Sequence, residues 1–186
     1  MDTQVLALVL PLIGWATHYG VLSRRLAAAR RDSLTGLLTR ANWNARAERM
    51  VRRHRDAVVL LVDLDDFKSL NDTYGHAAGD AALTTAAARL AEWCGRHGVA
   101  GRLGGDEFVA VVSRPPLSLG LADLVRELNR PFRHAGRTLP LAASVGSCRL
   151  ADLPVRALPD ALAAADAAMY AVKGSAGRRG RHPVSH

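Results

Sequence analysis

The chain has 186 residues, 49% of them hydrophobic, which is enough for one globular domain plus a short appendage. Its net charge of +8 at pH 7 comes from an arginine-rich composition with only two lysines, and it suits a triphosphate substrate or an anionic membrane surface. No basic stripe interleaved with aromatic residues occurs, so we expect no nucleic-acid partner. Cys94 and Cys148 form no CxxC pair, which favours a reducing, cytosolic compartment.

An apolar stretch near the N-terminus is the first unusual segment. Residues 5–21 contain no Asp, Glu, Lys or Arg, and they are at the short end of the length that spans a bilayer. Asp2 precedes the stretch and four arginines follow it by residue 31, which places the rest of the chain in the cytoplasm. A cleaved signal peptide fits poorly, because the basic region is on the wrong side. We therefore expect a single-pass membrane anchor; the alternative is a packed helix of a soluble cytoplasmic protein.

Two polar motifs come next. Residues 31–40 form a polar turn that opens a helix, and their spacing alone indicates no chemistry. Residues 57–62 are a short, β-branched apolar run, which is typical of a buried central strand. Asp63 ends this run, and a carboxylate there is costly to desolvate unless it pairs or binds a cation, so it is a candidate ligand for Mg²⁺ or Mn²⁺. Asp65 or Asp66 is expected to be a helix N-cap.

Residues 71–80 combine glycine, Asn and Asp, which predicts a loop that enters a helix over residues 81–93. The amide of Asn71 offers a donor and an acceptor, and the carboxylate of Asp80 can accept hydrogen bonds from guanine N1–H and the 2-amino group. From the residues alone, Asp80 is either such a guanine contact or the N-cap of the helix. His76 has no second His or Cys at metal spacing, which favours a structural, hydrogen-bonding histidine.

Residues 102–108 place two glycines and two adjacent carboxylates between strand-like runs. Gly-Gly between such runs predicts a tight hairpin, because the favoured two-residue turns need a positive φ that glycine adopts at little cost. Asp106 and Glu107 then lie at the turn, with their side chains on opposite faces. Taken alone, this pattern also fits a solvated hairpin tip.

The remaining segments complete an α+β order. Residues 123–130 predict a helix, residues 138–148 predict further strand pairing, and residues 160–173 predict an alanine-rich helix with a Leu-Ala-Met core stripe. This order predicts an antiparallel-centred sheet with flanking helices, similar to the palm of nucleotide cyclases and polymerases, preceded by a short hydrophobic N-terminal helix.

These motifs resemble the GGDEF family of diguanylate cyclases. Residues 32–40 are similar to its Asp-x-Leu-Thr-Gly-Leu-x-Asn-Arg opening, with Thr39 in place of Asn. Residues 63–80 resemble its Asp-x-Asp-x-Phe-Lys-x-x-Asn-Asp-x-x-Gly-His-x-x-Gly-Asp signature without a gap, and residues 102–108 resemble the name-giving motif without a substitution. Residues 165–173 match the closing helix. Four ordered motifs at family spacing are poorly explained by chance.

The resemblance implies an activity and a domain plan. It implies a GGDEF domain over residues 31–180, between an N-terminal segment 1–30 and a tail 181–186. It also implies condensation of two GTP molecules into cyclic di-GMP and two pyrophosphates, by metal-assisted attack of a ribose 3′-hydroxyl on an α-phosphate. Because one domain holds one GTP, the resemblance implies a homodimer. The alternative is a non-catalytic module that binds GTP or cyclic di-GMP on the same fold.

The resemblance further implies roles for individual residues. Metal ligands would be Asp63, the backbone carbonyl of Leu64, Asp106 and Glu107, and the last two would share the catalytic role. Asn71 and Asp80 would bind the guanine base. Other substrate contacts would come from Phe67, Lys68, His76, Gly104, Gly105, Lys173 and Arg178.

Two departures from the family pattern affect these expectations. Arg178 follows Lys173 by one residue more than the family spacing of four, so its contact with phosphate stays open. The family's product-inhibition motif, Arg-x-x-Asp, falls on Gly95 and Gly98 here. We therefore expect this inhibitory site to be absent.

Overall fold

The computed structural model describes Trp15, residues 30–113 and residues 120–179, and of residues 174–179 only the backbone. The anchor predicted over residues 5–21 lies outside the described residues, apart from Trp15, and stays a prediction. Within the described part of the chain, no helix is both long enough and apolar enough to cross a membrane.

A five-stranded sheet in the order β1-β3-β4-β2-β7 forms the centre of the domain. The β1–β3 pair is parallel and the other pairs are antiparallel, so the predicted α+β fold with an antiparallel-centred sheet is confirmed. A separate two-stranded sheet pairs β5 with β6. The strands are β1 (Leu38–Thr39), β2 (Val58–Leu64), β3 (Gly98–Gly104), β4 (Glu107–Val112), β5 (Phe132–His134), β6 (Arg137–Leu139) and β7 (Ala143–Arg149).

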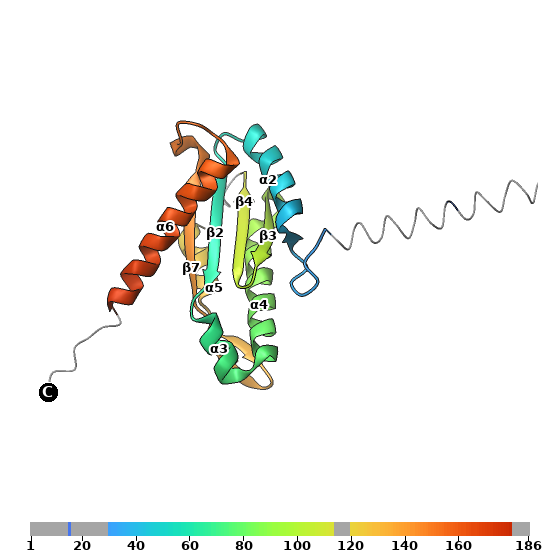
Figure 1. Ribbon diagram of the computed structural model, residues 1–186, viewed down its shortest axis with the longest axis vertical. Coiled ribbons are helices and arrows are strands. Elements are labelled where there is room, and N and C mark those ends of the chain that lie inside the picture. The colour runs from blue at the N-terminus through green and yellow to red at the C-terminus, as the bar shows by residue number, and fades with distance from the viewer. Residues whose placement is uncertain (1–14, 16–29, 114–119, 180–186) are drawn as a thin grey trace, which may run out of the picture.

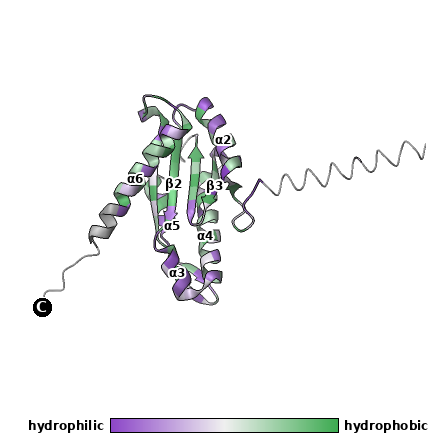
Figure 2. Ribbon diagram, viewed as in Figure 1, coloured by the Kyte–Doolittle hydropathy of each residue, from purple (hydrophilic) through white to green (hydrophobic). Residues whose placement is uncertain are grey.

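Helices cover both faces of the five-stranded sheet. Figure 1 shows α6 crossing in front of β7 and β2, with α4 behind β3. In Figure 2 the strands are largely hydrophobic and α3 is largely hydrophilic, in keeping with the lack of fully buried residues in α3. The helices are α2 (Arg40–Arg53), α3 (Phe67–Tyr74), α4 (His76–Cys94), α5 (Leu121–Leu128) and α6 (Leu158–Arg179), with 3₁₀ turns η1 (Gly95–His97) and η2 (Leu150–Asp152).

The side chains of β2 alternate between two cores, as the pleat of a strand requires. Its even-numbered residues from Val58 to Leu64 pack with α4 and α5, whereas Val59 and Leu61 pack with α2 and α6. Asp63 continues the odd-numbered series. Its side chain is therefore directed to the face of the sheet that α6 covers.

The loop predicted over residues 71–80 is wrong. Asn71 lies within α3, and α4 begins at His76. Gly75 separates the two helices with a φ of 84°, and this single glycine is enough to turn the chain between two helical segments. Gly75 also holds the N-cap position of α4, so the alternative of Asp80 as N-cap is wrong.

The other predicted elements are present with shifted ends. The helices expected over residues 123–130 and 160–173 correspond to α5 and α6, which both begin earlier. The pairing expected over residues 138–148 divides between β6 and β7. The three residues of β5 were not predicted, since so short a strand shows no alternating pattern. In the stripe predicted for the last helix, Ala165 is fully buried and Leu162 is partly buried.

Candidate functional site

Asp63 and the β3–β4 hairpin meet at one end of the sheet. In the register of β2 with β4, Asp63 lies opposite Glu107. The backbone N–H of Leu64 donates a hydrogen bond to the carbonyl of Asp106 at 3.3 Å. Opposed residues of an antiparallel pair share a face, with Cβ atoms about 4.5–5.5 Å apart. The structure thus brings together the four residues expected to bind metal.

The hairpin turn consists of Gly105 and Asp106, because Gly104 already pairs with Glu107. The φ angles of Gly104 and Gly105 are 150° and 52°, and a Cβ on either glycine would meet no atom within 4 Å. The two glycines are therefore required by backbone conformation rather than by packing. The predicted hairpin is confirmed, with its turn displaced by one residue, and open space lies beside the two glycines.

Lys173 of α6 contacts the same carboxylate. Its Nζ donates a hydrogen bond to Asp63 Oδ1 at 2.5 Å, and the two side chains are 36% and 18% exposed. The helix approaches the sheet closely because Gly146 of β7 has no side chain. A Cβ at Gly146 would collide with the carbonyl of Ala165 and lie 2.6 Å from the Met169 nitrogen. Lys173 was expected to contact the substrate, and in the structure its ammonium group contacts the candidate metal ligand Asp63.

The oxygen atoms at this end of the sheet suit a divalent cation. Asp63 and Glu107 present carboxylates on one face of adjacent strands, and Mg²⁺ and Mn²⁺ prefer such ligands. Lys173 already places a positive charge on Asp63, so the position accepts a cation. Among the described residues, no three His, Cys, Asp or Glu side chains gather as a metal-binding group. A complete ligand set would therefore need backbone carbonyls or substrate oxygens as well.

Asn71 and Asp80 are brought together by the packing of α3 on α4. The side chain of Asn71 lies directly on Gly79: a Cβ there would collide with Asn71 Oδ1 and lie 2.8 Å from its Cγ. Asp80, the next residue, is exposed and borders a surface groove along α4. The amide of Asn71 thus lies against the residue that precedes Asp80 in α4.

The start of α3 fits a phosphate group. Phe67 packs against the core, and Lys68 is exposed beside it. Asp66 is the predicted N-cap residue, but it has a φ of 53° and makes no side-chain capping hydrogen bond. The first N–H groups of the helix therefore lack a side-chain cap and present a partial positive charge. Asp65 instead accepts a hydrogen bond from the Ser144 hydroxyl at 2.8 Å.

Two predicted substrate residues are not brought to the site by described contacts. His76 is the exposed first residue of α4, and within the described residues no hydrogen bond of its side chain is found, so its expected structural role has no support. Arg178 belongs to α6, but its side chain is outside the described part of the chain. Its contact with phosphate stays a prediction.

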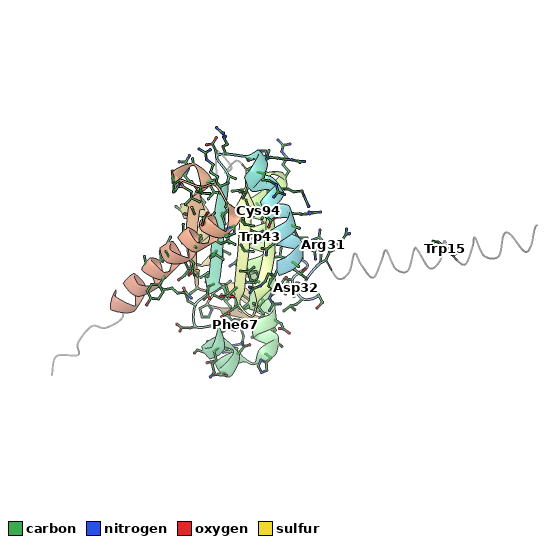
Figure 3. All side chains as sticks on the ribbon, turned by 45° about the horizontal axis from the view of Figure 1, so that its top comes forward. Trp15, Arg31, Asp32, Trp43, Phe67 and Cys94 are labelled. Carbon is green, nitrogen blue, oxygen red and sulfur yellow. The ribbon has the colours of Figure 1, made fainter. Side chains whose placement is uncertain are left out.

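A network behind the hairpin was not predicted. Arg102 donates from Nη1 to Asp32 Oδ1 at 3.0 Å, and from Nε and Nη2 to the Gly105 carbonyl at 3.0 and 2.7 Å. Asp32 also accepts hydrogen bonds from the backbone and hydroxyl of Thr35. We call this network the Asp32–Arg102 clamp; Figure 3 shows Asp32 at the edge of the sheet near α2.

The clamp explains the polar turn whose spacing indicated no chemistry. Burial pushes the pKa of Asp32 upward, but the hydrogen bonds from Thr35 and Arg102 outweigh it and hold that pKa below its ordinary value. The carboxylate therefore stays charged and ties the turn at residues 32–37 to the hairpin. The sequence held one signal of this network, because Arg102 is a charged residue inside an otherwise apolar, strand-like run.

Comparison with known proteins identifies the family of this chain. A family model described as "Diguanylate cyclase, GGDEF domain" matches residues 29–179, and the chain belongs to the GGDEF family. It is 64% identical over 184 residues to a Streptomyces ambofaciens protein named "Uncharacterized 19.3 kDa protein in repSA 5'region", covering 99% of this chain and 100% of that protein. It is 37% identical over 125 residues to the probable diguanylate cyclase DgcC of Escherichia coli K12, covering 62% of this chain and 34% of that protein.

Solved structures agree with the family. A sensory box/GGDEF family protein from Caulobacter crescentus is 34% identical with a TM-score of 0.69, covering 79% of this chain and 99% of that one. The coiled coil and GGDEF domain of DgcB from the same organism shares the fold at a TM-score of 0.81, with 23% identity and 97% of each chain covered. This chain spans about a third of the length of DgcC and of the diguanylate cyclase TpbB of Pseudomonas aeruginosa. These comparisons support cyclic di-GMP synthesis as the general activity of the class.

Proposed function

We propose that this chain is a diguanylate cyclase that condenses two GTP molecules into cyclic di-GMP and two pyrophosphates. The observation that carries the proposal is the register of β2 with β4, which sets Asp63 opposite Glu107 beside the open glycine turn. Attack of a ribose 3′-hydroxyl on an α-phosphate requires removal of a proton and stabilisation of growing negative charge. A carboxylate at the end of the sheet can accept the proton, and the other carboxylates there would hold the divalent cation that stabilises the negative charge.

The residues divide these tasks. Asp63, Asp106 and the carbonyl of Leu64 would hold Mg²⁺ or Mn²⁺, which neutralises phosphate charge and aligns the reacting groups when bound. Glu107 is exposed at the start of β4, where it can accept the hydroxyl proton or complete the ligand set. Lys68 and the uncapped first turn of α3 would bind the terminal phosphates.

Guanine selectivity is assigned to the helix pair. Asn71 and Asp80 offer hydrogen-bond partners that match the guanine edge and mismatch the adenine 6-amino group. The collision that a Cβ on Gly79 would make with Asn71 supports this assignment, because it shows that the amide lies against the residue next to Asp80.

We also propose a homodimer and a membrane location. Each domain supplies one GTP, so two copies must face each other for the condensation. Residues 5–21 would anchor the chain, with the arginines that follow them on the cytoplasmic side. Confinement to a membrane plane would raise the effective concentration of the facing copies. The alternative location is the cytoplasm, as a soluble protein.

A second candidate is a non-catalytic module that binds GTP or cyclic di-GMP. The observation that favours it is the ion pair of Lys173 with Asp63, which engages a candidate metal ligand. The extra residue between Lys173 and Arg178 also favours the non-catalytic module. Neither hairpin acid is lost, however, and so the cyclase is the better supported candidate.

Incubation of purified full-length protein with GTP and Mg²⁺ or Mn²⁺ tests the proposal. Cyclic di-GMP and pyrophosphate should form in a ratio of one to two. The nearly isosteric Asp63→Asn and Asp106→Asn should each lower turnover about 100-fold or more while circular dichroism stays unchanged. Asp56→Asn is the matched control, since Asp56 is an exposed carboxylate just before the opposite end of β2. GTP binding without product in the wild type would favour the module, and near-normal turnover of Asp63→Asn would refute the metal assignment.

A further inference from the structure

We propose that Lys173 is a resident counter-ion that a divalent metal must displace from Asp63, and that the displaced ammonium group then pairs with the triphosphate. The inference rests on the proposed function, because it requires that Asp63 bind a metal. It adds an order of events at the site: the cation on Asp63 is exchanged when nucleotide and metal arrive together.

The ion pair is unlike most others in the described part of the chain. Three of the five ion pairs there join residues only three or four positions apart. The Asp63–Lys173 pair joins residues separated by 110 positions and links the end of β2 to the last helix. Its acceptor is only 18% exposed, so the ammonium group replaces much of the water that would otherwise solvate the charge.

Lys173 and a metal would compete for the carboxylate of Asp63. The ammonium group takes Oδ1 of Asp63 at hydrogen-bond distance, and a doubly charged ion at the same carboxylate would lie within a few ångströms of it. The two cations repel, so metal binding alone must overcome the Asp63–Lys173 attraction. A triphosphate brings several negative charges, and it therefore gives the ammonium group a new partner as the metal takes its old one.

The geometry of α6 permits this exchange without unfolding. The part of the helix that packs on the sheet carries Ala161 and Ala165, both fully buried. Beyond it Tyr170 is 78% exposed and Val172 is 48% exposed, and Figure 1 shows this end of α6 projecting away from the sheet. The four-carbon stem of Lys173 can therefore swing at the surface while the buried turns stay in place.

Two affinities should respond to loss of the ammonium group with opposite signs. Lys173→Met should tighten the binding of Mn²⁺ alone by roughly three- to tenfold, because Asp63 loses its competing partner. The same variant should weaken the binding of a non-hydrolysable GTP analogue in the presence of Mn²⁺ by a similar factor. Lys173→Arg keeps the charge and should stay near the wild type in both measurements. A merely structural role for Lys173 would not tighten metal binding.

The experiment is a titration of nucleotide-free full-length protein with Mn²⁺, followed by electron paramagnetic resonance of the free ion, and calorimetry with the GTP analogue. Arg52→Met is the matched control, because it removes an exposed positive charge from α2. Asp63→Asn should lose the Mn²⁺ site. The proposal is overturned if Lys173→Met binds Mn²⁺ no more tightly than the wild type, or if Asp63→Asn binds it as the wild type does. The expected Mn²⁺ shift without cyclic di-GMP formation would reject the cyclase and leave the exchange intact.

Discussion

Arg102→Met is expected to destabilise both the fold and the hairpin that carries the two acids. The side chain of Arg102 is 15% exposed and makes three hydrogen bonds, one to Asp32 and two to the Gly105 carbonyl. Hydrogen bonds to charged groups contribute about 1.5–3 kcal/mol each when buried, and less where water competes. Because the methionine keeps an apolar stem but no donor, we expect a loss of about 2–3 kcal/mol in the free energy of unfolding.

Urea denaturation and initial rates of cyclic di-GMP formation measure the two effects. A turn that is no longer tied through its carbonyl holds Asp106 and Glu107 less firmly, and misplacement by about 1 Å can lower turnover about 100-fold. Arg40→Met is the matched control, since Arg40 is exposed and donates one hydrogen bond to the Leu103 carbonyl. The control should cost less than about 1 kcal/mol and leave turnover near the wild type.

A double-mutant cycle with Asp32→Asn separates the clamp from local effects. Residues that share one network should show a coupling of about 0.5–3 kcal/mol, whereas independent residues add. The lowered pKa of Asp32 means that its stabilisation is present above the unfolded pKa of about 3.9 and is lost as the pH falls through the folded pKa. The difference between the wild type and Asp32→Asn should therefore shrink below about pH 4. Additive energies, or wild-type turnover of Arg102→Met, would refute the clamp.

Three other regions give shorter tests. Gly79→Ala should displace Asn71, raise the GTP concentration at half-maximal rate and let ATP compete better, while equal use of ATP and GTP by the wild type would contradict the assignment. Product inhibition should be weak and progress curves linear to micromolar product; Gly98→Asp should not restore it, because a Cβ there would lie 2.5 Å from Val112 Cγ1. Carbonate or high salt should not extract the full-length protein from membranes, whereas detergent should. Deletion of residues 1–23 should give a soluble form whose specific activity rises with protein concentration. Full-length protein that is soluble without detergent would remove the anchor.

Strand patterns predicted the centre of the site well, because alternation and turn chemistry are local. The apolar run before Asp63 became β2, and the runs on either side of the two glycines became β3 and β4. Their register did not follow from the sequence, because the turn consists of Gly105 and Asp106 rather than of the two glycines, which shifts the pairing of the two strands. The helix pair was less predictable: Gly75 alone breaks the chain there, and neither Asn71 nor Gly79 interrupts its helix.

Polar contacts between residues far apart in the chain could not be predicted from local sequence patterns. The Asp32–Arg102 clamp joins residues 70 positions apart, and the sequence holds 25 basic and 17 acidic residues with no local rule for which of them pair. The resemblance to the family indicated that both motifs matter, but gave Arg102 no role. Only the packing of the 32–37 turn beside the hairpin decides the partner.

The position of Lys173 follows from two local rules that become informative only together. Ala161 and Ala165 are buried against the sheet, and Lys173 follows Ala165 by eight residues, which at 3.6 residues per turn turns it about 80° away from that buried face of α6. A lysine at the flank of a buried helix face lies at the edge of the core, where its charge needs an acidic partner. The second rule is strand alternation: the odd-numbered residues of β2 face α6, and Asp63 is the last of them. Helix periodicity and strand alternation thus direct one cation and one carboxylate to the same place, and in the exchange proposed above a metal that binds Asp63 takes the place of Lys173.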